Sequence, residues 1–130
     1  MKIGVLSLQG NYKMHANVLK TIGAEPKYIR YIDELNDVEG LIIPGGESTT
    51  MSKLMAREGF FDSIKEFAKK YPVLGTCAGL IMMSEKIIDG NLSTLGLLEI
   101  NTKRNGYGRQ INSGTVQVDF NLDDTIKFYA

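Results

Sequence analysis

The chain has few of the residues that cross-link small proteins or bind metals in them. Its 130 residues include one cysteine, Cys77, and one histidine, His15. A single cysteine excludes an intramolecular disulfide and a multi-cysteine metal site, and a single histidine excludes the common zinc sites. We therefore expect no metal and no cofactor. A reducing cytoplasm is the simplest location to expect for such a chain.

The chain also lacks a net charge and a long apolar run. Lys plus Arg and Asp plus Glu each number 15, so the formal charge is zero. Nucleic acids and acidic membrane surfaces attract clustered positive charge, and a membrane span needs about 20 apolar residues. We expect neither as a partner. The composition, 43% hydrophobic and 23% charged, is typical of one globular domain over residues 1–130 that buries a core without cross-links.

Over the first 88 residues, short apolar runs typical of strands alternate with segments in which apolar residues recur at helical spacing. Short runs rich in β-forming residues predict strands at 3–8, 26–31, 41–43 and 72–75. Helical repeats of apolar residues lie between and after these runs, over 15–22, from the expected cap Ser48 to the interruption at Gly59, and over 60–70 and 78–88. Strands that alternate with helices predict a flavodoxin-like α/β fold, with a doubly wound, mostly parallel sheet and helices on both faces.

Three finer expectations follow from the same patterns. Ser48 is expected to cap the second helix. Partial alternation over 95–103 and 115–120 predicts two further strands around a glycine-rich basic loop, 104–110. The run after residue 125 has no closing element before Ala130, so we expect an incomplete sheet or an edge that a partner covers. The first helix is expected to bury one face, made of His15, Val18, Leu19 and Ile22.

The strongest chemical signal is Cys77, which lies between a predicted strand and a predicted helix. Its neighbours Gly75 and Gly79 fit a tight turn that larger side chains would block. Such a turn lifts the sulfur above the carboxyl edge of the sheet and aims the following N–H groups, from Ala78 onward, at the same point, where they can stabilise an oxyanion. The alternative is a small buried cysteine. The glycines and the strand–helix context favour a nucleophile.

Two other segments are weaker candidates for a ligand site. Gly45 and Gly46 follow a predicted strand at its carboxyl end, where ligands bind in such folds. The segment is not a phosphate loop, because the Lys of that motif is missing. Glu47 is either a substrate contact or a favourable charge in the first turn of its helix. Arg104 could hold a carboxylate through two hydrogen bonds, although the residues alone favour a solvated hairpin tip for this loop. For His15 we favour a packing or interface role over catalysis, without excluding proximity to Cys77.

Four ordered motifs resemble one known family. They closely resemble the glutaminase subunit of pyridoxal 5'-phosphate synthase, a class I, triad-type glutamine amidotransferase. The cysteine turn alone is typical of the broad superfamily, whereas the basic loop together with the double-glycine loop is more specific. The motifs are Val5-Leu6-Ser7-Leu8-Gln9-Gly10, Pro44-Gly45-Gly46-Glu47-Ser48-Thr49-Thr50, Gly75-Thr76-Cys77-Ala78-Gly79-Leu80 and Arg104-Asn105-Gly106-Tyr107-Gly108-Arg109-Gln110.

The resemblance implies a role for each matching residue. Cys77 matches the nucleophile that attacks the side-chain amide of L-glutamine, so that ammonia leaves and a glutamyl thioester remains for water to hydrolyse. Gly46 and Ala78 match the oxyanion hole. The glutamine-binding positions are Gly46, Glu47, Ser48 and Arg104. In the family, ammonia passes to a synthase subunit that makes pyridoxal 5'-phosphate, and the helix after Gly10 resembles a segment near that subunit interface.

The sequence departs from the family at its end. The family's catalytic His and Glu lie in a His-Pro-Glu stretch near the C-terminus, followed by a glutamine-binding Ile-Arg pair, and no match occurs before Ala130. The resemblance therefore implies an incomplete domain and very weak or no hydrolysis by this form. Two alternatives stay open. One is a non-catalytic module that binds the synthase subunit, and the other is a different cysteine hydrolase of similar architecture, such as an intracellular peptidase or a glyoxalase-like hydrolase.

Overall fold

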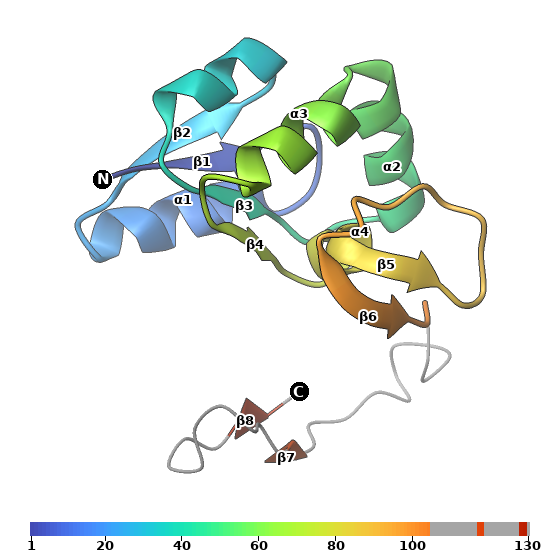
Figure 1. The fold of residues 1–130 in the computed structure, drawn as a ribbon. Coiled ribbons are helices and arrows are strands. Elements are labelled where there is room, and N and C mark those ends of the chain that lie inside the picture. Colours follow the sequence, from blue (N-terminus) through green and yellow to red (C-terminus); the bar gives the residue numbers. More distant parts are fainter. Residues whose placement is uncertain (105–116, 119–127, 130) are drawn as a thin grey trace.

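The computed structural model describes residues 1–104, 117–118 and 128–129. Its centre is a four-stranded parallel sheet in the order β2-β1-β3-β4 (Figure 1). The strands are short, and those in the middle are almost wholly apolar, as expected when both faces are covered. The four strands are β1 (Lys2–Leu6), β2 (Glu25–Ile29), β3 (Leu41–Ile43) and β4 (Val73–Gly75).

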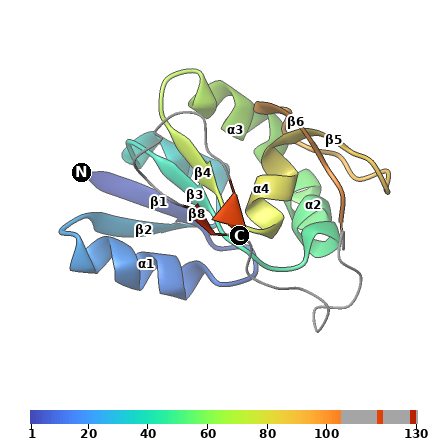
Figure 2. The same ribbon diagram turned by 90° about the horizontal axis from the view of Figure 1, so that it is seen from below.

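Helices cover the two faces of this sheet unequally. One face carries α1 (Tyr12–Thr21) alone, whereas α2 (Ser48–Arg57), α3 (Phe60–Ala68) and α4 (Ala78–Met83) lie over the other (Figure 2). A 3₁₀ helix, η1 (Ile32–Asp37), follows β2 and packs against α3. The predicted fold, with a parallel sheet and helices on both faces, is confirmed.

The buried side chains form two clusters, one on each face. The larger cluster joins the sheet to α2, α3 and α4, and Phe60, Ile64 and Met55 within it are fully buried. The smaller cluster consists of Ile3, Val5, Leu19 and Ile42, with Tyr12 and Ala24 packed against it. The predicted inward repeat of α3 is confirmed, because Phe60, Ile64 and Phe67 are all buried.

The predicted inward face of α1 is wrong in part. Leu19 is buried, but Val18 is 58% exposed and Ile22 is 71% exposed. The helix instead turns Ala16 and Leu19 toward the sheet. Only these two residues of α1 are buried, and the other apolar side chains, Met14, Val18 and Ile22, face outward.

The predicted helix over 78–88 is also wrong beyond its first half. Helix α4 ends at Met83, and residues Ser84–Ile87 form β5, which pairs in parallel with β6 (Leu98–Thr102). The Ser84 hydroxyl donates to the Ile81 carbonyl and contacts the Thr102 hydroxyl, which fixes the change of direction. Strand β6 confirms the strand predicted over 95–103, and the pair lies apart from the main sheet, beside α4 (Figure 1).

The remaining elements are two short paired strands, β7 (Gln117–Val118) and β8 (Phe128–Tyr129), which run antiparallel. The predicted loop 105–110, the rest of the strand predicted over 115–120 and most of the tail lie outside the described residues. Strand β4 forms one edge of the four-stranded sheet, where Leu74 is 56% exposed. In the described part of the chain, no helix has the length and apolar character needed to cross a membrane.

Candidate active site

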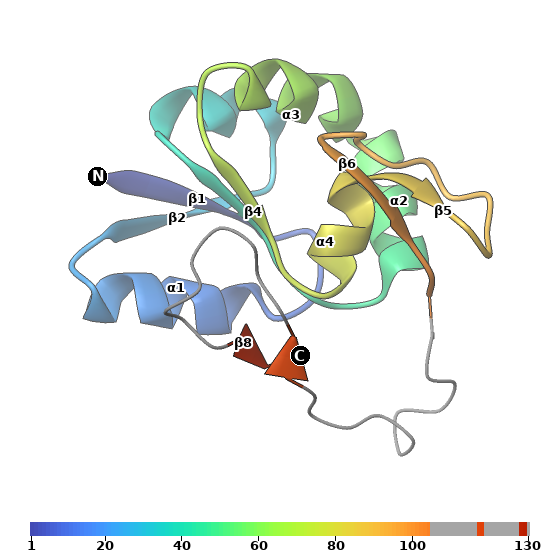
Figure 3. The same cartoon turned by 60° about the horizontal axis from the view of Figure 1, so that its bottom comes forward.

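Three loops meet at the carboxyl edge of the sheet (Figure 3). The chain leaves β1 toward β2 on one side and returns to β3 on the other, so the loops after β1 and β3 flank a switch point, where ligands bind in open α/β sheets. The Asn11 N–H donates to the Gly45 carbonyl at 3.0 Å, which joins these two loops. The Thr76 N–H donates to the Ile43 carbonyl at 3.1 Å and brings in the loop after β4.

Cys77 lies exposed on the third loop in a strained backbone conformation. Its φ of 52° and ψ of −113° make it the one non-glycine residue with positive φ in the described part of the chain. Such a conformation costs about 1–3 kcal/mol and persists where the surroundings enforce it, most often at functional sites. A Cβ built on Gly45 would lie 3.9 Å from the Cys77 sulfur, so the thiol lies against the double-glycine loop.

Glycines allow the backbones of these loops to approach so closely. A Cβ on Gly79 would collide with the carbonyl oxygen of Ile43, and a Cβ on Gly10 would collide with that of Gly45. Gly10 also has a φ of +85°, which side chains rarely adopt. Gly79 is therefore needed for packing the turn against β3, and Gly75 for the close approach of Gly79, as the glycine-flanked sequence pattern indicated.

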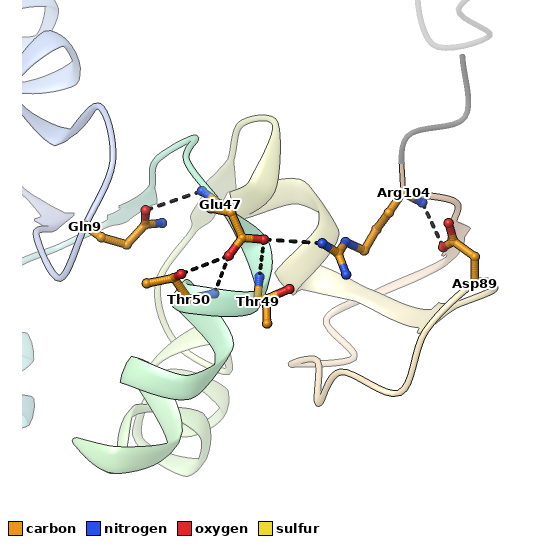
Figure 4. Close-up of polar contacts among 6 residues, drawn as sticks. All are labelled: Gln9, Glu47, Thr49, Thr50, Asp89 and Arg104. Carbon is orange, nitrogen blue, oxygen red and sulfur yellow. Dashed lines mark hydrogen bonds and ion pairs between the residues drawn. The ribbon is translucent and has the colours of Figure 1, made fainter. Parts of the chain in front are cut away.

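Glu47 caps helix α2, which corrects the expectation that Ser48 would do so. Its carboxylate accepts hydrogen bonds from the N–H groups of Thr49 and Thr50, at 3.0 and 2.8 Å, and from the Thr50 hydroxyl (Figure 4). Ser48 is instead the first helical residue and is buried. The three donors lower the pKa of the Glu47 carboxyl from 4.5 to about 2, since each stabilises the ionised form.

Arg104 reaches the same carboxylate from β6. Its Nη2 lies 3.2 Å from Glu47 Oε1, and its own backbone N–H donates to Asp89 Oδ1 at 2.9 Å (Figure 4). On the other side, the Gln9 side chain accepts from the Glu47 N–H at 3.3 Å. Glu47 therefore stands between the first loop and the basic end of β6, with 54% of its side chain exposed.

His15 projects from α1 toward the cysteine loop. Its Nε2 lies 3.1 Å from the hydroxyl oxygen of Thr76, the residue before Cys77. The half-buried ring thus contacts the residue that precedes Cys77. His15 therefore lies close to the site, a question that the sequence left open, and it contacts the Thr76 hydroxyl.

The structure brings the predicted residues into two neighbouring groups. Cys77 and Ala78 lie beside the double-glycine loop, and Glu47 pairs with Arg104. Gln9 and Asp89, which sequence reasoning did not assign to the site, support Glu47 and Arg104. Gln9 stood in a recognised motif, whereas no local pattern marks Asp89. A surface hollow of about 720 Å³ lies elsewhere, between η1 and α3, and contains none of these residues.

Comparison with protein families gives the lineage of this site. Residues 5–130 match the model of the SNO glutamine amidotransferase family. The chain belongs to this family. It is 48% identical over 117 residues to the pyridoxal 5'-phosphate synthase subunit PdxT of Solibacter usitatus, covering 90% of this chain and 61% of that protein. It is 50% identical over 113 residues to the protein of the same name from Oenococcus oeni, covering 87% and 59%. This family member thus spans about 60% of the length of these relatives.

Solved structures agree with the family's fold. A crystal structure titled as a glutamine amidotransferase superposes with a TM-score of 0.83 at 35% identity, covering 98% of this chain and 68% of the other. A structure titled as a putative peptidase E from Listeria monocytogenes reaches a TM-score of 0.60 at 12% identity over 75% of this chain, which shows a shared fold alone. The glutamine amidotransferase architecture is therefore the fold of this chain.

Proposed function

We propose that the chain carries the nucleophile of a glutaminase that acts on L-glutamine. The Cys77 sulfur bonds to the side-chain carboxamide carbon, the C–N bond then breaks, and nitrogen leaves as ammonia after taking up a proton. Water hydrolyses the resulting thioester to glutamate and restores the thiol. The exposed, strained Cys77 against the double-glycine loop is the observation that carries this proposal.

Backbone N–H groups are proposed to hold the oxyanion that forms in this attack. Gly46 and Ala78 are the proposed donors, because Ala78 follows the nucleophile and Gly46 belongs to the loop that Cys77 touches. Among the described residues, neither N–H has a backbone acceptor. Donors free of internal partners suit a charge that appears only during the reaction.

Glutamine itself is proposed to bind along Gly46, Glu47, Ser48 and Arg104. The Arg104 guanidinium suits the α-carboxylate of the substrate, and the Glu47 carboxylate suits its α-ammonium group. The contact between Arg104 and Glu47, 3.2 Å long, shows that both charges reach the same place. Ser48 is buried at the start of α2, so its part is to shape the loop rather than to meet solvent.

Within this proposal, the residues that the structure describes supply no general base to Cys77. The one histidine of the chain contacts Thr76 in the structure. We propose that the base and its carboxylate partner belong to a C-terminal part of the kind present in the longer relatives. The 130-residue form is then expected to hydrolyse glutamine very weakly. That C-terminal part and residues 1–130 would together form a single amidotransferase domain.

The ammonia is proposed to pass to the synthase subunit of pyridoxal 5'-phosphate synthase in the cytoplasm. The relatives are named as subunits of that synthase. Helix α1 and its C-cap residue support such docking, because Met14, Val18 and the C-cap Ile22 point outward in one row, each more than half exposed. Apolar rows of this kind on a surface helix commonly mark protein interfaces. A module that docks without catalysis is the second candidate, favoured by the absence of any match to the family's His-Pro-Glu stretch in the 130 residues.

The test is glutamate release from glutamine. We expect release by a chain extended to the length of its relatives, with the synthase subunit present, and loss of at least about a thousandfold in the Cys77→Ala variant. The 130-residue chain is the comparison and should be nearly inactive. Release that does not depend on Cys77 would refute the proposal. Binding of the extended chain to the synthase subunit with no glutamate release would favour the docking module.

A further inference from the structure

The contact between His15 and Thr76 joins α1 to the loop that holds the nucleophile. The two side chains lie 3.1 Å apart, Nε2 to Oγ1, although 61 positions separate them in the chain. Among the described residues, this is the one side-chain hydrogen bond made to the loop 75–79. Every other hydrogen bond found there joins backbone groups, such as the Thr76 N–H to Ile43 and the Gly79 N–H to the Thr76 carbonyl.

The backbone of this loop has to be held against its own strain. Cys77, with its φ of 52°, would relax toward a common conformation if the surrounding contacts were weaker. Thr76 is the residue from which the strained bend starts. The hydrogen bond from the Thr76 side chain to His15 links the loop to α1, which lies on the opposite face of the sheet from α4. This bond restricts rotation of the Thr76 side chain and movement of the adjoining peptide.

We propose that His15 is a positioning residue that holds Thr76 and thereby keeps the Cys77 thiol exposed at the carboxyl edge. This inference rests on the proposed role of Cys77 as the nucleophile. It assigns to His15 no proton transfer with substrate, since its Nε2 is engaged with the Thr76 hydroxyl. It also explains why a polar ring lies on the inner side of α1, half-buried beside the apolar Ala16 and Leu19.

The experiment measures the rate at which iodoacetamide alkylates the thiol. Cys77 is the only cysteine, so the mass gain of the intact 130-residue chain reports this residue alone. Two variants remove the contact, His15→Leu and Thr76→Val. Two conservative variants keep the contact. His15→Gln places a polar atom the same number of bonds from Cα as the histidine Nε2, and Thr76→Ser keeps the hydroxyl.

The expected result is a coupled loss of reactivity. His15→Leu and Thr76→Val should each slow alkylation by about threefold to tenfold, and the double variant should be no slower than either single one. His15→Gln and Thr76→Ser should stay within about twofold of the parent chain. Asn17→Leu, an exposed change on the same helix, is the matched control and should leave the rate unchanged. Circular dichroism and the melting temperature show whether each variant is folded.

Three outcomes would overturn the inference. Additive losses in the double variant would show that the two side chains act separately. Unchanged alkylation with a lower melting temperature would show that His15 only packs. His15→Gln as slow as His15→Leu, with an altered pH profile, would indicate a proton-transfer role. Because alkylation needs no glutamine turnover, these outcomes are distinct from Cys77-independent glutamate release, which refutes the proposed function and leaves the positioning result standing.

Discussion

The two faces of the sheet carry very different amounts of core. On one face, fourteen buried residues join the strands to α2, α3, α4 and η1. On the other, a cluster of four buried residues joins the strands to α1. Helix α3 has all its apolar repeats inside, whereas α1 leaves the row of Met14, Val18 and Ile22 outside. The same sheet therefore has one face devoted to stability and one whose helix has side chains available for other contacts.

The thin face, which α1 covers, is also the face from which a side chain reaches the loop that carries Cys77. His15, on the inner side of α1, contacts Thr76, and the outer side of the same helix is apolar and exposed. A helix with few core contacts costs little stability when its surface is selected for something else. The difference between the faces agrees with the proposals that α1 contacts the cysteine loop on its inner side and a partner on its outer side.

The largest expected effect tests the thick face, the one that α2, α3 and α4 cover. Phe60→Ala removes a fully buried aromatic ring from the larger cluster and should lower the free energy of unfolding by about 3–5 kcal/mol, measured by urea denaturation. The adjacent Phe61, which is only partly buried, is the matched control. Equal losses in Phe60→Ala and Phe61→Ala would mean that the larger cluster does not dominate stability.

The same measurement on the thin face should give a smaller loss. Leu19→Ala truncates one of the four buried residues that join α1 to the sheet, and should lower the free energy of unfolding by about 2 kcal/mol. This loss is at the low end for a buried leucine, because α1 can shift toward the sheet and fill part of the cavity. A loss as large as that of Phe60→Ala would break the comparison between the two faces.

Substitution on the outer row of α1 should leave stability nearly unchanged. Val18→Ser is expected to alter the free energy of unfolding by less than about 0.5 kcal/mol, since the side chain is already mostly exposed. Its affinity for the synthase subunit should fall at least about tenfold, as titration calorimetry would show. Asn17→Ser, exposed on the same helix, should change neither quantity. Unchanged affinity in Val18→Ser would remove the docking role of this row.

The smallest expected effect concerns the rim of the thick face, where Glu47 caps α2. Its pKa is lowered from 4.5 to about 2, so the cap stabilises the fold fully above pH 4.5, and this contribution disappears as the pH falls toward 2. Because the side chain is 54% exposed, the contribution should be under about 1 kcal/mol.

Glu47→Gln tests this cap directly. The variant should be less stable than the parent chain at pH 6, and the gap should narrow steadily below pH 4.5 and close only as the pH falls through about 2, as followed by urea denaturation at each pH. Glu85→Gln, exposed on β5, is the control for the loss of a carboxylate and should show no such pH-dependent gap. A gap that is the same at both pH values would mean that the charge of Glu47 contributes nothing to the cap.

Local patterns predicted most of the sheet but not every helix. Strands β1, β3 and β4 were predictable because a short apolar run bounded by glycine or proline has few other uses in a small domain. Residues 84–87 were not predictable as a strand, since their pairing with β6 depends on a partner ten or more positions away. The outward turn of Val18 was missed because helical spacing shows which residues share a face and not how much of that face a neighbour covers.

The candidate site divides in the same way. The amino-acid sequence by itself determined that Cys77 stands on a glycine-flanked turn beside a double-glycine loop, because only small residues allow those backbones to meet. Tertiary structure alone decided that Glu47 caps α2 and faces Arg104, that Asp89 holds Arg104, and that His15 reaches Thr76. Those contacts join residues that are distant in the chain, and their formation depends on how the packed layers orient each helix.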